Sequence, residues 1–78
     1  MGNKIKLLWD FRGPDALKTA EHFLIHLNEF VERESVVAEK TDIEKHTDMF
    51  VSTILITESS YLEILKNALK PSRGQKVV

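Results

Sequence analysis

The absence of cysteine decides how this short chain can be stabilised. Its 78 residues suit one domain, because chains divide only well above ~200 residues. Without cysteine, disulfide bonds, zinc–thiolate sites and thiol catalysis are all excluded. The fold must therefore rest on a well-packed apolar core, on a partner, or on both. The composition allows such a core, since 42% of the residues are hydrophobic and 29% are charged.

The sequence shows no sign of export or of a membrane segment. No uninterrupted apolar run exceeds three residues, whereas a membrane-spanning helix needs about 20. The N-terminal region also lacks the charged start, apolar stretch and small-residue cleavage site of a signal peptide. We therefore expect a cytoplasmic protein that does not bind membranes.

Apolar spacing predicts a strand followed by a long helix. Apolar residues alternate along residues 4–11 and define the face that we expect to point inward: Ile5, Leu7, Trp9 and Phe11. Gly13-Pro14-Asp15 then favours a helix start, since proline suits the first helical position. Helical spacing continues over residues 16–34, with Ile25 opposite the apolar stripe.

The second half of the chain predicts two more strands and a second helix. Residues 36–43 are rich in charge, as in an edge strand, and residues 44–48 are expected to form a polar connector. Residues 49–57 are apolar on both faces, as in a central strand. A capping-box pattern at Ser60-Tyr-Leu-Glu63 predicts a helix that ends at Lys70.

The order of these elements predicts an α+β, ferredoxin-like split β-α-β fold. The whole chain, residues 1–78, would form one domain in the order β-α-β-β-α, with both helices on one face of an antiparallel sheet. Residues 71–78 would be a tail or would include a short fourth strand at 75–78. Such a strand is short for covering the first strand, and an open edge invites pairing with another chain. We therefore expect a homodimer through the first-strand edge, with outward apolar side chains such as Leu8 adding contact surface; a tail folded over that edge is the monomeric alternative.

Two histidines at helical spacing are the most site-like feature. His22 and His26 lie one turn apart, and Glu29 follows on the same flank, so the three could hold a metal ion. A zinc-protease helix would carry glutamate directly after the first histidine, but Phe23 stands there. The alternative is that both imidazoles simply border the apolar stripe.

Asp10 and Arg12 form a second candidate binding site at the end of the first predicted strand. The two side chains share one face, where they could bind a polar ligand or orient a histidine. The alternative is a partly exposed ion pair of little consequence. No motif for nucleophilic catalysis or phosphate binding is found, and no cofactor is expected.

The basic residues are gathered at the C-terminal end. Residues 66–78 carry four basic residues and no acidic one, although the net charge of the chain is −1. The block could recognise an acidic partner, or it could reflect only the preference of lysine for helix C-termini. The acidic remainder of the chain argues against binding to nucleic acid.

Two segments, IKLLWDFRGPDA (5–16) and AEHFLIHL (20–27), resemble a small bacterial family of stand-alone α+β proteins with no assigned activity. The resemblance covers about a third of the chain and implies no catalytic residues. We therefore expect a non-enzymatic protein-interaction or ligand-binding module that acts as a homodimer. The alternative is a small metal-binding protein or enzyme that uses the His22/His26 flank.

Overall fold

The structure, a computed structural model that describes residues 3–77, has four strands and two helices in the part of the chain that it describes. The elements in chain order are β1 (Lys4–Arg12), α1 (Ala16–Arg33), β2 (Ala38–Thr47), β3 (Phe50–Glu58), a 3-10 turn (Ser59–Tyr61), α2 (Leu62–Leu69) and β4 (Arg73–Val77). This arrangement confirms the predicted α+β class. Neither α1 nor α2 is long and apolar enough to cross a membrane.

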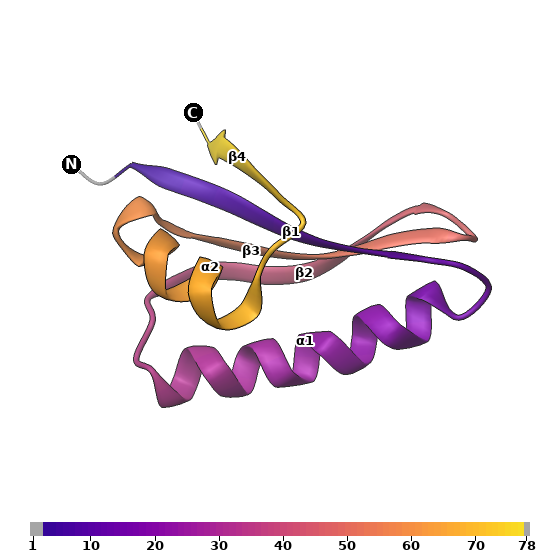
Figure 1. The fold of residues 1–78 in the computed structure, drawn as a ribbon, viewed down its shortest axis with the longest axis horizontal. Helices are drawn as coiled ribbons and strands as arrows, with labels where there is room; N and C mark the ends of the chain where they lie inside the picture. Colours follow the sequence, from indigo (N-terminus) through magenta and orange to yellow (C-terminus); the bar gives the residue numbers. More distant parts are fainter. Residues whose placement is uncertain (1–2, 78) are drawn as a thin grey trace.

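The strands form one open antiparallel sheet in the order β2-β3-β1-β4 (Figure 1). β3 pairs with β1 without a break, from Glu58 opposite Lys4 to Phe50 opposite Arg12. On its other side β3 pairs with β2, so that it is covered by strands at both edges. This central position agrees with the apolar residues on both faces of β3.

Both helices contribute to a core on one face of the sheet. The main cluster of buried side chains comes from both helices, two strands and the loop before β2: Ile5, Leu7, Trp9, Leu27, Phe30, Val36, Leu55 and Leu65. Each large apolar side chain buried in this way contributes ~1.5–3 kcal/mol. The predicted inward face of β1 is thus confirmed, and Ile25 on the opposite side of α1 is 61% exposed.

Trp9 connects this core to the C-terminal end of the chain. Its indole ring lies 5.2 Å from the ring of Phe23, centroid to centroid. Its Nε1–H donates a hydrogen bond of 2.8 Å to the carbonyl oxygen of Leu69, the last residue of α2. Trp9 therefore fixes the point from which the chain enters β4.

The predicted end of β2 and the predicted start of α2 are wrong. The polar connector at residues 44–48 is largely strand, because β2 continues to Thr47 and only Asp48 and Met49 form the turn. An edge strand with one covered face tolerates such polar residues. The predicted capping box does not form either: α2 begins at Leu62, without a side-chain cap. The Ser59 N–H donates to the Asn3 carbonyl, which keeps this segment tied beside β1 and delays the helix.

The C-terminal segment covers most of the first-strand edge that the sequence left open. β4 pairs with β1 from Val77 opposite Lys4 to Arg73 opposite Leu8. Ser72 extends the cover, since its N–H donates to the Leu8 carbonyl and its Oγ accepts from the Asp10 N–H. The last strand therefore begins two residues earlier than predicted, and Val78, at the end of the predicted strand, lies outside the described residues.

Candidate functional site

A chain of hydrogen bonds crosses all four strands on the sheet face opposite the helices. The guanidinium of Arg73, on β4, contacts Asp10 on β1 with Nε–Oδ2 and Nη2–Oδ1 distances of 2.9 and 3.1 Å. Ser52, on β3, donates its hydroxyl to Asp10 Oδ1 at 2.6 Å. His46 Nε2, on β2, lies 3.0 Å from Ser52 Oγ. We call these four residues the cross-sheet chain.

The charge state of Asp10 fixes the direction of the hydrogen bonds. Burial by itself raises the pKa of this carboxyl group, but hydrogen bonds from Ser52 and Arg73 lower it. The positive charges of Arg73 and Arg12 act in the same direction, so that the pKa lies below the usual value. Asp10 is therefore ionised at neutral pH and accepts from Ser52, which must accept in turn from the Nε2–H of His46.

This proton arrangement does not suit nucleophilic catalysis. A nucleophilic serine gives its proton to an imidazole that a carboxylate orients. Here Ser52 gives its proton directly to Asp10, and the His46 nitrogen that faces it carries a proton. The Ser52 side chain is also fully buried. The cross-sheet chain therefore links the four strands rather than presenting a reactive group.

Arg12 is not the ion-pair partner of Asp10, contrary to the simplest reading of their spacing. Its guanidinium carbon lies 4.0 Å from the centroid of the Phe50 ring, which it faces from the neighbouring strand. The ring of His46 packs against Phe50 from β2, with a centroid distance of 4.5 Å. Asp10 pairs instead with Arg73, which reaches it from the other side of β1.

The apolar centre of this open face is already covered. Lys6 Nζ lies 2.5 Å from Glu44 Oε2, which joins β1 to β2 across β3. The register places this ion pair over Ile54, which is only 3% exposed. Leu8, expected to add outward contact surface, is only 2% exposed, and it is flanked by Arg73. The open face therefore does not offer the apolar surface that the sequence suggested for a dimer.

The predicted histidine pair lies on α1, on the other side of the sheet. The rings of His22 and His26 are stacked, with their centroids 4.8 Å apart. Glu29 Oε1 lies 3.3 Å from His26 Nδ1 in an exposed pair. Within residues 3–77, no group of three or more His, Asp or Glu side chains is placed to hold a metal ion. The use of this flank by a metal stays a prediction, which calorimetric titration with zinc would test.

β4 is the one strand among the described residues in which every residue is exposed. All of β4 is exposed, and it pairs with β1 on one side only. Beside it, on the helix side, lies a shallow hollow of about 260 Å³ lined by Ile5, Leu7, Leu62, Gly74, Gln75 and Lys76. The core ends at the short helix α2, so the side chains around the hollow are mainly apolar, with Lys76 beside them.

Sequence reasoning found Asp10 but missed its partners. Ser52 and Arg73 are 42 and 63 residues away along the chain, so no local spacing links them to Asp10. The missing information was the register: once β3 is placed beside β1, Ser52 falls opposite Asp10. Arg73 lies before the fourth strand predicted at 75–78, so the prediction did not place it in β4.

Comparisons with known proteins provide no relative for this chain. No protein-family model matches it, and neither a curated protein nor a solved structure is significantly similar. The functional argument therefore rests on the chain's own residues.

Proposed function

We propose that the chain is a non-enzymatic protein-interaction module that binds an extended segment of another chain along the outer edge of β4. The observation that carries this proposal is the state of that edge: β4 is fully exposed and has a strand neighbour on one side only. A strand with unpaired N–H and C=O groups is a template for β-strand addition.

The alternatives on the same sheet are less suited to a partner. On the open face the polar side chains are already paired. The residues of the cross-sheet chain bond to one another, and Lys6 pairs with Glu44. The other edge strand, β2, is interrupted by two register shifts and carries charges of both signs. Bulges and charges of this kind are known means of protecting an edge from pairing.

We also propose the ferredoxin-like class for this domain. Three features support it: the β-α-β-β-α-β order, the place of β3 between β1 and β2, and the core shared by both helices. The class hosts many unrelated functions, so the function is argued here from the edge and not from the class.

Hydrogen exchange of the β4 amides tests the function directly. The probe is a blocked extended peptide, VTQTVTQT, and its control is the same peptide with every amide nitrogen methylated. Strand addition needs the peptide amides, so the unmodified peptide should slow exchange in β4 and the methylated one should not. Equal exchange with both peptides, together with an unchanged rate at high protein concentration, would contradict the proposal.

A homodimer joined at β4 is the second candidate. An antiparallel pair centred on Gln75 places Arg73 opposite the partner subunit's Val77 and Gly74 opposite the partner subunit's Lys76, so no like charges lie directly opposite each other. Val77→Lys would place a lysine opposite arginine and should weaken self-association, whereas Val77→Glu should strengthen it. Val37→Lys, just before β2, is the matched control. Sedimentation equilibrium that shows a monomer for every variant would rule the homodimer out.

A further inference from the structure

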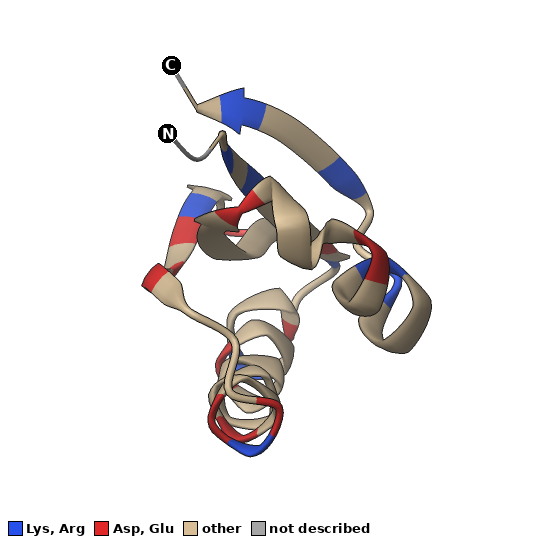
Figure 2. Ribbon diagram, turned by 90° about the vertical axis from the view of Figure 1, so that its left-hand side faces the viewer, with Lys and Arg blue, Asp and Glu red and all other residues tan. Residues whose placement is uncertain are grey.

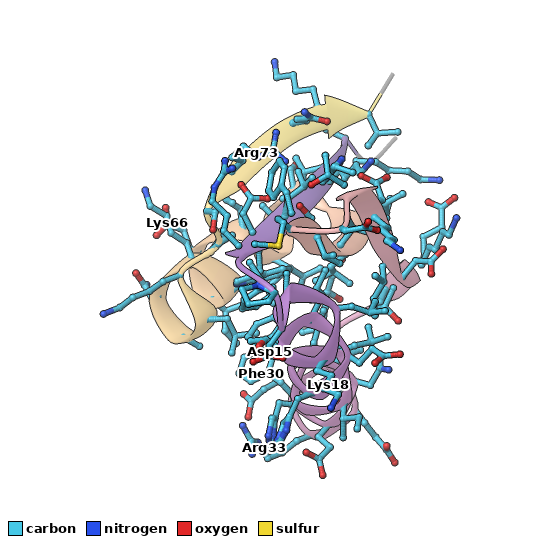
Figure 3. The ribbon with its side chains drawn as sticks, turned by 90° about the vertical axis from the view of Figure 1, so that its right-hand side faces the viewer. Asp15, Lys18, Phe30, Arg33, Lys66 and Arg73 are labelled. Atoms are coloured by element: carbon cyan, nitrogen blue, oxygen red, sulfur yellow. The ribbon has the colours of Figure 1, made fainter. Side chains whose placement is uncertain are left out.

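Positive charge predominates around β4. β4 carries Arg73 and Lys76 and no acidic residue, and only blue segments are seen along it in Figure 2. α2 carries Lys66 in its last turn and Glu63 in its first turn, and Lys70 follows at its end. In Figure 3 Arg73 lies at the start of β4 and Lys66 extends from α2, whereas Lys18 and Arg33 lie apart on α1. We call Arg73 and Lys76 of β4, together with Lys66 and Lys70, the basic edge.

Most of the basic edge is not neutralised by the rest of the chain. Arg73 is engaged by Asp10, but the ion pairs among the described residues include none that involves Lys66, Lys70 or Lys76. All twelve acidic residues lie within residues 1–65, and Glu63 is the one that α2 carries. A partner at β4 would therefore meet uncompensated positive charge.

The hollow beside β4 adds an apolar component to the same place. Ile5, Leu7 and Leu62 line the hollow. Gly74 has no side chain to fill it, whereas a Cβ at that position would lie 3.4 Å from Leu7 Cδ2. Lys76 lies two residues further along β4, so its side chain points to the face of the sheet on which a side chain at position 74 would lie. Lys66 lies one helical turn after Leu62, on the same side of α2.

We propose that the partner at this edge is an acidic extended peptide segment with apolar and acidic residues alternating along one face. The inference rests on the proposed strand addition at β4. In the added strand, an apolar side chain next to Gly74 enters the hollow, and an acidic side chain next to Lys76 meets its ammonium group. The opposite face, next to Arg73 and Gln75, takes uncharged polar residues because Asp10 already engages Arg73.

A second copy of the chain satisfies this edge less well. Its own β4 would bring a further Arg73 and Lys76 to the basic edge, with no acidic side chain in either strand. The two β4 strands would together bring four basic side chains close to one another, although none lies directly opposite another. An acidic segment removes this repulsion and fills the same backbone positions.

The affinities of three matched peptides test the inference. VTETVTET places valine and glutamate alternately on one face; VTKTVTKT and VTQTVTQT replace glutamate by lysine and glutamine. Binding to the full chain is followed by fluorescence anisotropy at low salt. We expect the glutamate peptide to bind at least tenfold more tightly than the lysine peptide, with the glutamine peptide in between. The preference should shrink as salt is added, because exposed charges are screened.

One substitution and its control locate the preference. Lys76→Glu should reverse the order of the glutamate and lysine peptides. Lys18→Glu makes the same change in net charge on α1, away from the basic edge, and should leave the order unchanged. Amide spectra of both variants establish that the fold is retained.

The outcomes distinguish failure of the acidic-partner inference from failure of the proposed strand addition at β4. If the lysine or glutamine peptide binds as tightly as the glutamate peptide, strand addition stands and the acidic partner is overturned. If Lys18→Glu reverses the order as Lys76→Glu does, the preference reflects net charge only and the inference is again overturned. If no peptide binds at millimolar concentration, the docking edge itself is overturned.

Discussion

The two edge strands of this sheet meet the same solvent but are protected in different ways. β2 is ten residues long, and its pairing with β3 is shifted at two points. Its residues Glu39, Lys40 and Glu44 take part in ion pairs. β4 is five residues long, is paired in regular register and carries only basic charges.

The difference shows how edge protection can be distributed within one small domain. Bulges and paired charges make β2 a poor template for a further strand. β4 has no register shift, and among the described residues its one ion pair joins Arg73 to Asp10 of β1. Its position in the sheet therefore depends on β1 and on contacts near its start. The edge strand that is held mainly by one neighbour, β4, is therefore also the edge open to a partner.

Trp9→Phe should have the largest effect. The change removes the hydrogen bond to the Leu69 carbonyl and leaves space in the core beside Phe23. We expect the free energy of unfolding to fall by about 2–3 kcal/mol. Hydrogen exchange should accelerate more in β4 than in β2, because this bond fixes the start of the β4 segment. Equal acceleration in both edges would contradict the role given to Trp9.

Asp10→Asn should loosen β4 with a smaller loss of stability. It weakens the contact with Arg73, which is 43% exposed, so that solvent reduces the effect. We expect a loss of about 1–2 kcal/mol in urea denaturation. Asp42→Asn, in the exposed Lys40–Asp42 pair of β2, is the control and should change stability by less than about 0.5 kcal/mol.

The difference in stability between the wild type and Asp10→Asn should depend on pH. The pKa of Asp10 is lower in the folded chain than in the unfolded chain, so its contribution is present above the unfolded-state pKa. It is lost as the pH falls through the lowered folded-state pKa. The difference in unfolding free energy between the wild type and Asp10→Asn should therefore be constant near neutral pH and should decrease in acid. A difference that grows in acid would contradict the ionised state of Asp10.

The smallest effects are expected where a helix leads into each edge strand. Ser35, before β2, and Lys70, before β4, have φ angles of 55° and 48°, a left-handed conformation that glycine adopts more readily. Ser35→Gly and Lys70→Gly should each raise the free energy of unfolding by about 0.5–1 kcal/mol. Thermal denaturation checks both. A loss of stability in either variant would show that its side chain makes a contact that outweighs the backbone strain.

The sequence predicted what depends on local periodicity. Alternation along Ile5 to Phe11 identified the inward face of β1, and helical spacing identified the exposed position of Ile25. Boundaries among polar residues were less certain: the end of β2 and the start of α2 depend on pairing with residues far away in the chain. The approach of β4 to β1 is also a long-range contact. A short strand or tail over this edge was an alternative in the sequence, but the start of β4 at Arg73 was not predicted.

The candidate sites were harder to predict for the same reason. Asp10 could be singled out, but its connection to Ser52 and Arg73 requires the register of three strands. The basic composition of residues 66–78 was visible in the sequence, whereas its arrangement beside an unpaired edge and an apolar hollow was not. Periodicity therefore predicts the faces of strands and charge predicted the edge position of β2, whereas the contacts between strands require the register of the assembled sheet.

A spin label on the peptide VTETVTET tests the central claim, that β4 is the docking edge, most directly. With the label at one peptide end, paramagnetic broadening of the backbone amide signals reports which residues the peptide approaches. If the peptide docks at β4, we expect strong broadening at Gly74, Gln75 and Lys76 and none along β2. Broadening confined to β2, or spread evenly over the surface, would contradict it.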